Sequence, residues 1–155
     1  MPLFLNLNLN IMNIFEALRQ EHEIQRELVD KLTKTHGDTE ERKKIFEQLK
    51  HELKIHADAE ERHFYVPLMK KDLTQGKARH SVAEHHEMDE LIEKLEDTEM
   101  DASNWLKLAK ELAHIVIHHL DEEEHEVFQM AGKALTDKQK ISLAEDYNKE
   151  IRKTR

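Results

Sequence analysis

The sequence has no cysteine, and it has little glycine (3 residues), proline (2) and aromatic residue (5%). Without cysteine the chain can form no disulfide, no thiolate metal site and no iron–sulfur cluster of its own. Few helix-breaking residues and many charged ones (37%) favour long helices over a sheet. A length of 155 residues suits one domain with one core. The composition therefore predicts an all-α domain.

The chain also lacks the features of nucleic-acid and membrane proteins. Its formal net charge is −9 and it has no long basic cluster, so we expect no nucleic-acid partner. It has no long apolar run and no signal-peptide pattern at Met1–Met12, so we expect no membrane partner and a cytoplasmic location. Histidine, in contrast, is abundant, with 12 residues.

The chain reads as a short extension followed by five helices. Residues 1–11 predict a loose N-terminal extension, and the phrase from Met12 resembles a natural start, so we assign the domain to residues 12–155. Apolar spacing predicts helices over about residues 13–35, 39–71, 77–96, 102–131 and 137–151.

Local signals support the ends of these helices. The predicted N-terminal caps pair a side chain with an acid or amide three residues later, at Asn13/Glu16, Asp38/Glu41 and Thr136/Gln139. Gly132 is a natural stop for the fourth helix. Pro67 is expected to kink or loosen the last turn of the second helix.

One motif, H-x-x-x-E-x-x-H, occurs twice. It covers residues 56–63 and again residues 118–125, and each copy lies on the apolar stripe expected for its helix. On a helix the three side chains of one copy fall within about 60° of one another. The segments from Glu21 (EHEIQRELVDKL) and Glu84 (EHHEMDELIEKL) also resemble each other, so the chain is a helix pair written twice. Two such pairs predict an up-down antiparallel four-helix bundle with a short fifth helix.

The inward faces of these helices carry several imidazoles and two acids. A single histidine on an apolar stripe is usually a hydrogen-bonded core residue, and runs such as those containing Glu61, Glu123 and Glu124 usually face solvent. Here, however, every long helix carries an inward histidine and two carry an acid one turn later: His22, His56, Glu60, His85, His118 and Glu122. Two buried acids without Lys or Arg nearby need a cation. The pattern therefore predicts a two-metal site.

Imidazole and carboxylate ligands without thiolate suit iron, manganese or zinc. The chain has no H-E-x-x-H sequence, so a mononuclear zinc peptidase site is unsupported. An E-x-x-H pattern occurs at Glu60/His63 and Glu122/His125, as in ferritin-like proteins, but those need another acid on each remaining helix, where this chain has His22 and His85.

The residues EH at 21–22, HADAE at 56–60, EH at 84–85 and HHLDE at 118–122 resemble the hemerythrin HHE cation-binding family over about residues 12–131. This resemblance implies a hemerythrin-like bundle with two non-haem iron ions and a small diatomic ligand or peroxide. The ligands that it implies are His22, His56, Glu60, His85, His118 and Glu122, with both acids bridging.

The resemblance is incomplete at two helices. Oxygen-carrying hemerythrins have H-x-x-x-H on the third helix, where this chain has only His85, and they place an aspartate one position later than Glu122 on the fourth. His63 and His125 are additional candidate ligands, either bound to metal or hydrogen-bonded beside it. We interpret the remaining histidines as non-ligands: His36, His51, His80, His86, His114 and His119.

Three functions remain open from the sequence. The first is a protein that binds O2, NO or peroxide for sensing, storage or detoxification, in a pocket walled by residues such as Phe46, Phe64 and Phe128. The second is an enzyme acting on peroxide or nitric oxide, or in iron–sulfur repair, which a site poorer in histidine would favour. The third is an interaction module whose bundle is stabilised by bound metal. Such a module could form a homodimer in which Tyr65, Trp105 and the fifth helix supply the contact surface.

Overall fold

Helices make up nearly all of the described chain, which in this computed structural model comprises residues 11–155. The expected loose extension over residues 1–11 therefore lies, except for Ile11, outside the described residues. The helical segments in order are α2 (Ile14–Thr33), α3 (Glu40–Glu60), η1 (Glu61–Tyr65), α4 (Val66–Met69), α5 (Gln75–Glu96), α6 (Ser103–Glu122), η2 (Glu123–Val127), α7 (Phe128–Ala134) and α8 (Asp137–Thr154).

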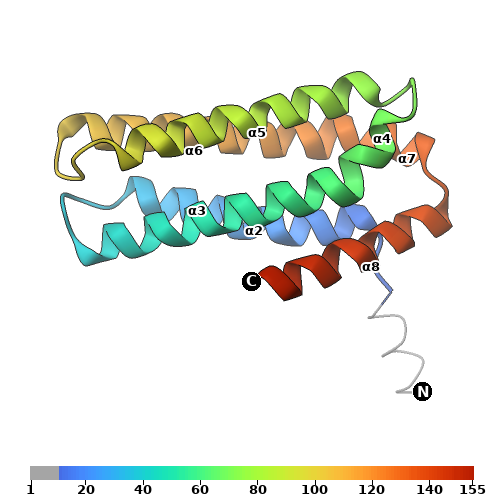
Figure 1. Cartoon of the computed structure of the whole chain (residues 1–155), viewed down its shortest axis with the longest axis horizontal. Coiled ribbons are helices and arrows are strands. Elements are labelled where there is room, and N and C mark those ends of the chain that lie inside the picture. The colour runs from blue at the N-terminus through green and yellow to red at the C-terminus, as the bar shows by residue number, and fades with distance from the viewer. Residues whose placement is uncertain (1–10) are drawn as a thin grey trace, which may run out of the picture.

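These segments form an up-down antiparallel four-helix bundle with a fifth helix at one end (Figure 1). The pair α2 and α3 lies beside the pair α5 and α6, and α8 packs against α2 and α3. The all-α bundle predicted from the sequence is thus confirmed. Within the described residues, no helix has both the length and the apolar character of a membrane span.

The helix ends follow local side-chain chemistry, with two corrections. The capping boxes at Asn13 and Thr136 are present as predicted. The predicted cap at Asp38 is wrong, because Thr39 accepts the hydrogen bond from the Arg42 amide, at 3.2 Å. The predicted stop at Gly132 is also wrong: α7 runs to Ala134, and the chain leaves the helix at Leu135 with extended backbone angles.

Two π-helical turns interrupt the long helices at matching places. In η1 the Val66 amide donates to the Glu61 carbonyl, five residues back, and in η2 the Phe128 amide donates to the Glu123 carbonyl. Pro67 lies two residues after η1, in the short helix α4, and has no N–H with which to donate a helical hydrogen bond.

The buried side chains form two apolar clusters along the bundle axis. One lies at the α8 end and includes Leu18, Phe64 and Tyr147; the other fills the opposite end and includes Leu49 and Leu112. The buried polar residues of all four long helices lie between the two clusters. The apolar layers therefore exclude water on both sides of a polar centre.

The sequence suggested a dimer surface made by Tyr65, Trp105 and the fifth helix, and the two aromatic residues are wrong. Tyr65 is fully buried and Trp105 is 1% exposed, so neither can contact a second chain. Trp105 instead donates from its indole nitrogen to the Leu95 carbonyl, at 3.1 Å, and packs edge-on against Phe46.

The orientation of α6 can be tested by stability. Leu112 is fully buried, whereas Leu108, which the sequence also placed inward, is half-buried. We expect Leu112→Ala to lower the free energy of unfolding by about 2–5 kcal/mol and Leu108→Ala to lower it by clearly less. Urea unfolding of both variants at unchanged m-value measures the difference. Equal losses would contradict this orientation.

Candidate metal centre

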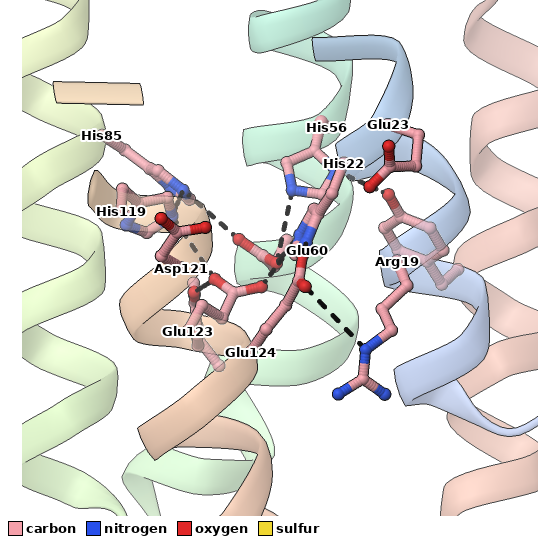
Figure 2. A network of polar contacts seen from close by, with 12 residues as sticks. Arg19, His22, Glu23, His56, Glu60, His85, His119, Asp121, Glu123 and Glu124 are labelled. Atoms are coloured by element: carbon pink, nitrogen blue, oxygen red, sulfur yellow. Dashed lines mark hydrogen bonds and ion pairs between the residues drawn. The ribbon is translucent and has the colours of Figure 1, made fainter. Parts of the chain in front are cut away.

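Four imidazoles and two carboxylates meet in the middle of the bundle (Figure 2). Each long helical segment contributes, and all six side chains are at least nine-tenths buried. They are His22 of α2, His56 and Glu60 of α3, His85 of α5, His119 of α6 and Glu123 of η2.

The first half of the centre is built by α2 and α3. The Nε2 atom of His22 lies 3.1 Å from Oε1 of Glu123 and 3.9 Å from Oε2 of Glu60. The Nε2 atom of His56 lies 3.3 Å from the same Glu60 oxygen. Two imidazole nitrogens and one oxygen from each carboxylate thus face a common point.

The second half repeats this arrangement with α5 and α6. The Nε2 atom of His85 lies 3.3 Å from Oε1 of Glu60, and Nε2 of His119 lies 3.3 Å from Oε2 of Glu123. The two nitrogens are 3.2 Å apart. Each carboxylate therefore turns one oxygen to each histidine pair, so Glu60 and Glu123 could each hold a cation on both sides.

The chemistry of these atoms fits cations better than hydrogen bonds. Several of the inward atoms are buried without a hydrogen-bond partner: Nε2 of His22 and His56, both oxygens of Glu60 and Oε1 of Glu123. Such groups are costly to bury unsatisfied. Ligands bound at about 2.1 Å around one tetrahedral ion lie about 3.4 Å from one another, close to the separations found here.

Comparison with known proteins identifies the fold and the family. Residues 13–131 match the family described as the hemerythrin HHE cation binding domain. The chain belongs to the hemerythrin HHE cation-binding family. A solved hemerythrin HHE domain-containing protein from Mycobacterium kansasii superposes with a TM-score of 0.83 at 22% identity, over 92% of this chain and 87% of that one.

A curated relative is similar in sequence over a longer protein. It is a protein from Nostoc sp. named DNA nickase, 26% identical over 136 residues. The match spans 88% of this HHE chain but only 38% of that protein.

Polar partners outside the HHE centre orient its imidazoles. The Nδ1 atoms that face away from the centre lie 2.6 Å from Glu124 for His22, 2.7 Å from the Tyr147 hydroxyl for His56, and 2.8 Å from Glu84 for His119. His85 differs, because its Nδ1 lies 3.6 Å from Glu61, beyond hydrogen-bond distance. A partner on Nδ1 keeps the proton there and leaves Nε2 free for a metal.

The electrostatic potential inside the centre is negative. Burial lowers the pKa of His119, but hydrogen bonds to Glu123 and Glu84 outweigh burial and raise that pKa to about 10. Burial raises the pKa of Glu60, yet the charge of His56 prevails and holds it well below its usual value. Burial also lowers the pKa of His22 and His85, but hydrogen bonds to nearby carboxylates outweigh burial and raise both pKa values. The centre therefore favours positive charge.

A tyrosine lies beside one half of the centre. Tyr65 is fully buried and its hydroxyl donates to Oε2 of Glu123. Burial raises the pKa of this phenol well above its usual value, and the Glu123 carboxylate raises it further, so the phenol keeps its proton.

The structure brings together four of the eight predicted ligands: His22, His56, Glu60 and His85. The inward orientation predicted for His118 and Glu122 is wrong, because the His118 side chain is 65% exposed and its neighbour His119 is 1% exposed. One position on a helix rotates a side chain by about 100°. His119 and Glu123 take these places. The sequence had indicated that His119 is a non-ligand and that Glu123 faces solvent.

His63 and His125 also lie outside the centre. The Nε2 atom of His63 lies 3.0 Å from Glu150 of α8, and Nδ1 of His125 lies 2.7 Å from the Asp121 carbonyl. Neither faces the six residues of the centre. Glu61 and Glu124, interpreted as solvent-facing, instead lie beside the outward nitrogens of His85 and His22.

The internal repeat contains the signal that would have found His119. His22 and His85 are 63 positions apart, and the same step leads from His56 to His119 and from Glu60 to Glu123. The choice of His118 instead implies a step of 62, which does not match the first helix pair.

Replacing single histidines tests this assignment. We expect His119→Ala to remove at least one of two bound metal ions per chain, because it deletes an inward nitrogen. His125→Ala is the matched control and should keep the wild-type metal content. Metal analysis after desalting, with circular dichroism to verify folding, measures both. Loss of metal in the control alone would contradict this assignment and make His125 a ligand, as the sequence had allowed.

The hydroxyl of Tyr147 offers a finer test. Tyr147→Phe keeps the ring by which α8 packs edge-on against His56 and removes only the oxygen beside His56 Nδ1. We expect the affinity for metal to fall by about 10–100-fold, with little change in unfolding by urea. Competition with a metal-binding dye measures the affinity; an unchanged value would mean that Tyr147 only packs.

Proposed function

We propose that this chain holds two non-haem iron ions in its HHE centre and binds O2, NO or peroxide there. The observation that carries this proposal is the division of the ligand atoms into two sets that share both carboxylates. His22 and His56 would hold one ion, His85 and His119 the other, and Glu60 and Glu123 would bridge them.

The donor set favours iron. Imidazole and carboxylate ligands suit iron, with manganese and zinc as other candidates, and a bundle core with bridging carboxylates is a setting of di-iron proteins. Iron, when bound, supplies the exchange of electrons that binding of O2 or peroxide requires.

The residues around the ions would control access and protonation. The Phe128 ring stacks on His22 with centroids 6.0 Å apart, and Phe64 packs against Phe128, so the α8 end of the centre is dry. The Tyr65 hydroxyl is a hydrogen-bond donor held at Glu123. It would hold a proton beside any ligand bound in that half.

Turnover of peroxide is the second candidate, and the number of imidazoles favours it. With His63 and His125 outside the centre, each ion would have only two histidines, together with oxygens of Glu60 and Glu123. Iron with six coordination positions would then keep more than one position for substrate, and the protonated Tyr65 hydroxyl would be a hydrogen-bond donor beside it.

We propose no activity on DNA for this chain from its similarity to the Nostoc relative. That protein is much longer than the matched region, and a chain with a net charge of −9 is poorly suited to a phosphate backbone.

Anaerobic loading with Fe²⁺ tests the proposal. We expect two irons per chain and an optical spectrum that changes on addition of O2, NO or peroxide, because both halves would bind iron and keep open positions. Fewer than two irons, or a spectrum unchanged by all three ligands, would contradict it.

The rate of peroxide consumption then separates binding from turnover. Consumption of many equivalents per centre indicates an enzyme, and one equivalent at most indicates a binder. Under turnover, Tyr65→Phe should slow consumption while the iron content stays at the wild-type value, so the variant separates the hydrogen bond donated by the phenol from metal binding.

A further inference from the structure

A second group of ligand-type side chains lies on the outer face of α5 and α6. It consists of His80, Glu84 and Glu122, whose ligand atoms lie close together, and of His118 beside Glu122; each histidine is followed by an acid one turn later. The Nε2 atom of His80 lies 3.6 Å from Oε2 of Glu84 and 3.5 Å from Oε1 of Glu122, and Nε2 of His118 lies 3.3 Å from Oε2 of Glu122. We call this group the outer cluster.

These separations fit a shared cation. Direct hydrogen bonds between nitrogen and carboxylate oxygen are usually 2.7–2.9 Å, well below the separations here. Two ligands bound at about 2.1 Å to one tetrahedral ion lie about 3.4 Å apart. The outer cluster thus has the spacing of cation ligands, and its separations are longer than those of direct hydrogen bonds.

Solvent exposure alone does not account for these residues. The equivalent positions in the first helix pair, 63 residues earlier, are Ala17, Glu21, Ile55 and Ala59, of which the three apolar residues pack in the cluster that contains α8. Within the described residues no helix covers the α5–α6 face in this way, so polar residues are expected there. A solvated face needs no particular type of polar residue. The α5–α6 face nevertheless carries two imidazoles and two carboxylates close to one another.

Glu84 connects the outer cluster to the HHE centre. Its side chain is nine-tenths buried; Oε1 lies 2.8 Å from Nδ1 of His119, and Oε2 faces His80. One carboxylate therefore contacts an inner imidazole and an outer one. His80 and Glu122 also line a surface hollow, which gives ions access from solvent.

The nearby positive charge is balanced. Lys77 also lines this hollow, but its ammonium group lies 2.5 Å from Glu126. The local surface thus keeps an excess of carboxylates, which attracts divalent cations.

We propose that the outer cluster is a separate binding site for a divalent cation such as Fe²⁺ or Zn²⁺, and that it loads the buried centre. The loading role rests on the proposed function, because it requires an inner metal site. The binding site itself does not.

The first experiment counts ions. Protein whose inner centre is filled with iron is titrated with Zn²⁺ by calorimetry, with the iron content measured before and after. We expect one additional ion per chain in the wild type and its loss in His80→Asn/His118→Asn, which leaves Glu84 and all inner residues unchanged. The matched control, His36→Asn/His51→Asn, replaces two exposed histidines elsewhere and should keep the ion.

The second experiment measures loading. Metal-free protein is mixed anaerobically with Fe²⁺, and uptake is followed by stopped-flow absorbance. We expect the double variant at 80 and 118 to fill about tenfold more slowly than the wild type, to the same final iron content, because the carboxylate-rich surface no longer holds cations near Glu84.

Each outcome is decisive. Absence of the additional Zn²⁺ in the wild type, or its retention in the double variant, overturns the outer site. Loss of that ion with an unchanged filling rate overturns the loading role alone. If the inner centre of the wild type takes up no iron, the proposed function and the loading role fail together, while Zn²⁺ bound by the metal-free protein and lost in the double variant still supports the outer site.

Discussion

Two buried carboxylates that no basic side chain neutralises are the constraint on which this structure depends. Within residues 11–155, neither Glu60 nor Glu123 pairs with lysine or arginine, and only imidazoles and one phenol approach them. Burying such acids is strongly unfavourable unless positive charge lies between or beside them. The placement of one imidazole pair on each side, in a bundle whose apolar layers exclude water, is the physical basis for assigning a cation to this HHE centre.

The two halves of the bundle share the inner residues and differ in how they are supported. His56 is held by Tyr147 of α8, whereas the equivalent His119 is held by Glu84 from its own helix pair. The α8 helix lies outside the region that matches the family, so this tyrosine is a contribution of the part of the chain beyond residue 131. Where α8 covers the bundle the outer positions are apolar, and where it is missing they carry the outer cluster. The two halves therefore have the same types of inward ligand, although different helices and side chains surround them.

The sequence predicted the bundle and the inward ligands of the first three helices. The apolar residues of each of these helices follow one narrow stripe, so only one face could point to the core. The fourth helix has apolar residues around much of its circumference, including Leu106, Leu108 and Ile115, which are half-buried. A stripe drawn through Leu108 and Ile115 leads to His118, and one drawn through Val116 leads to His119. Periodicity could not choose between two adjacent histidines followed by adjacent acids; only contact with the other helices, or the constant step of the repeat, does so.

The π-helical turns explain why the site has few imidazoles. After Glu60 a regular helix would turn His63 inward, but with η1 the first buried positions are Phe64 and Tyr65, four and five residues after the acid. The same offset follows Glu123, where Val127 and Phe128 are buried. Since the second turn has no proline after it, Pro67 cannot be the common cause. The extra residue in each turn brings aromatic and apolar side chains to the core where a regular helix would have placed His63 or Glu126.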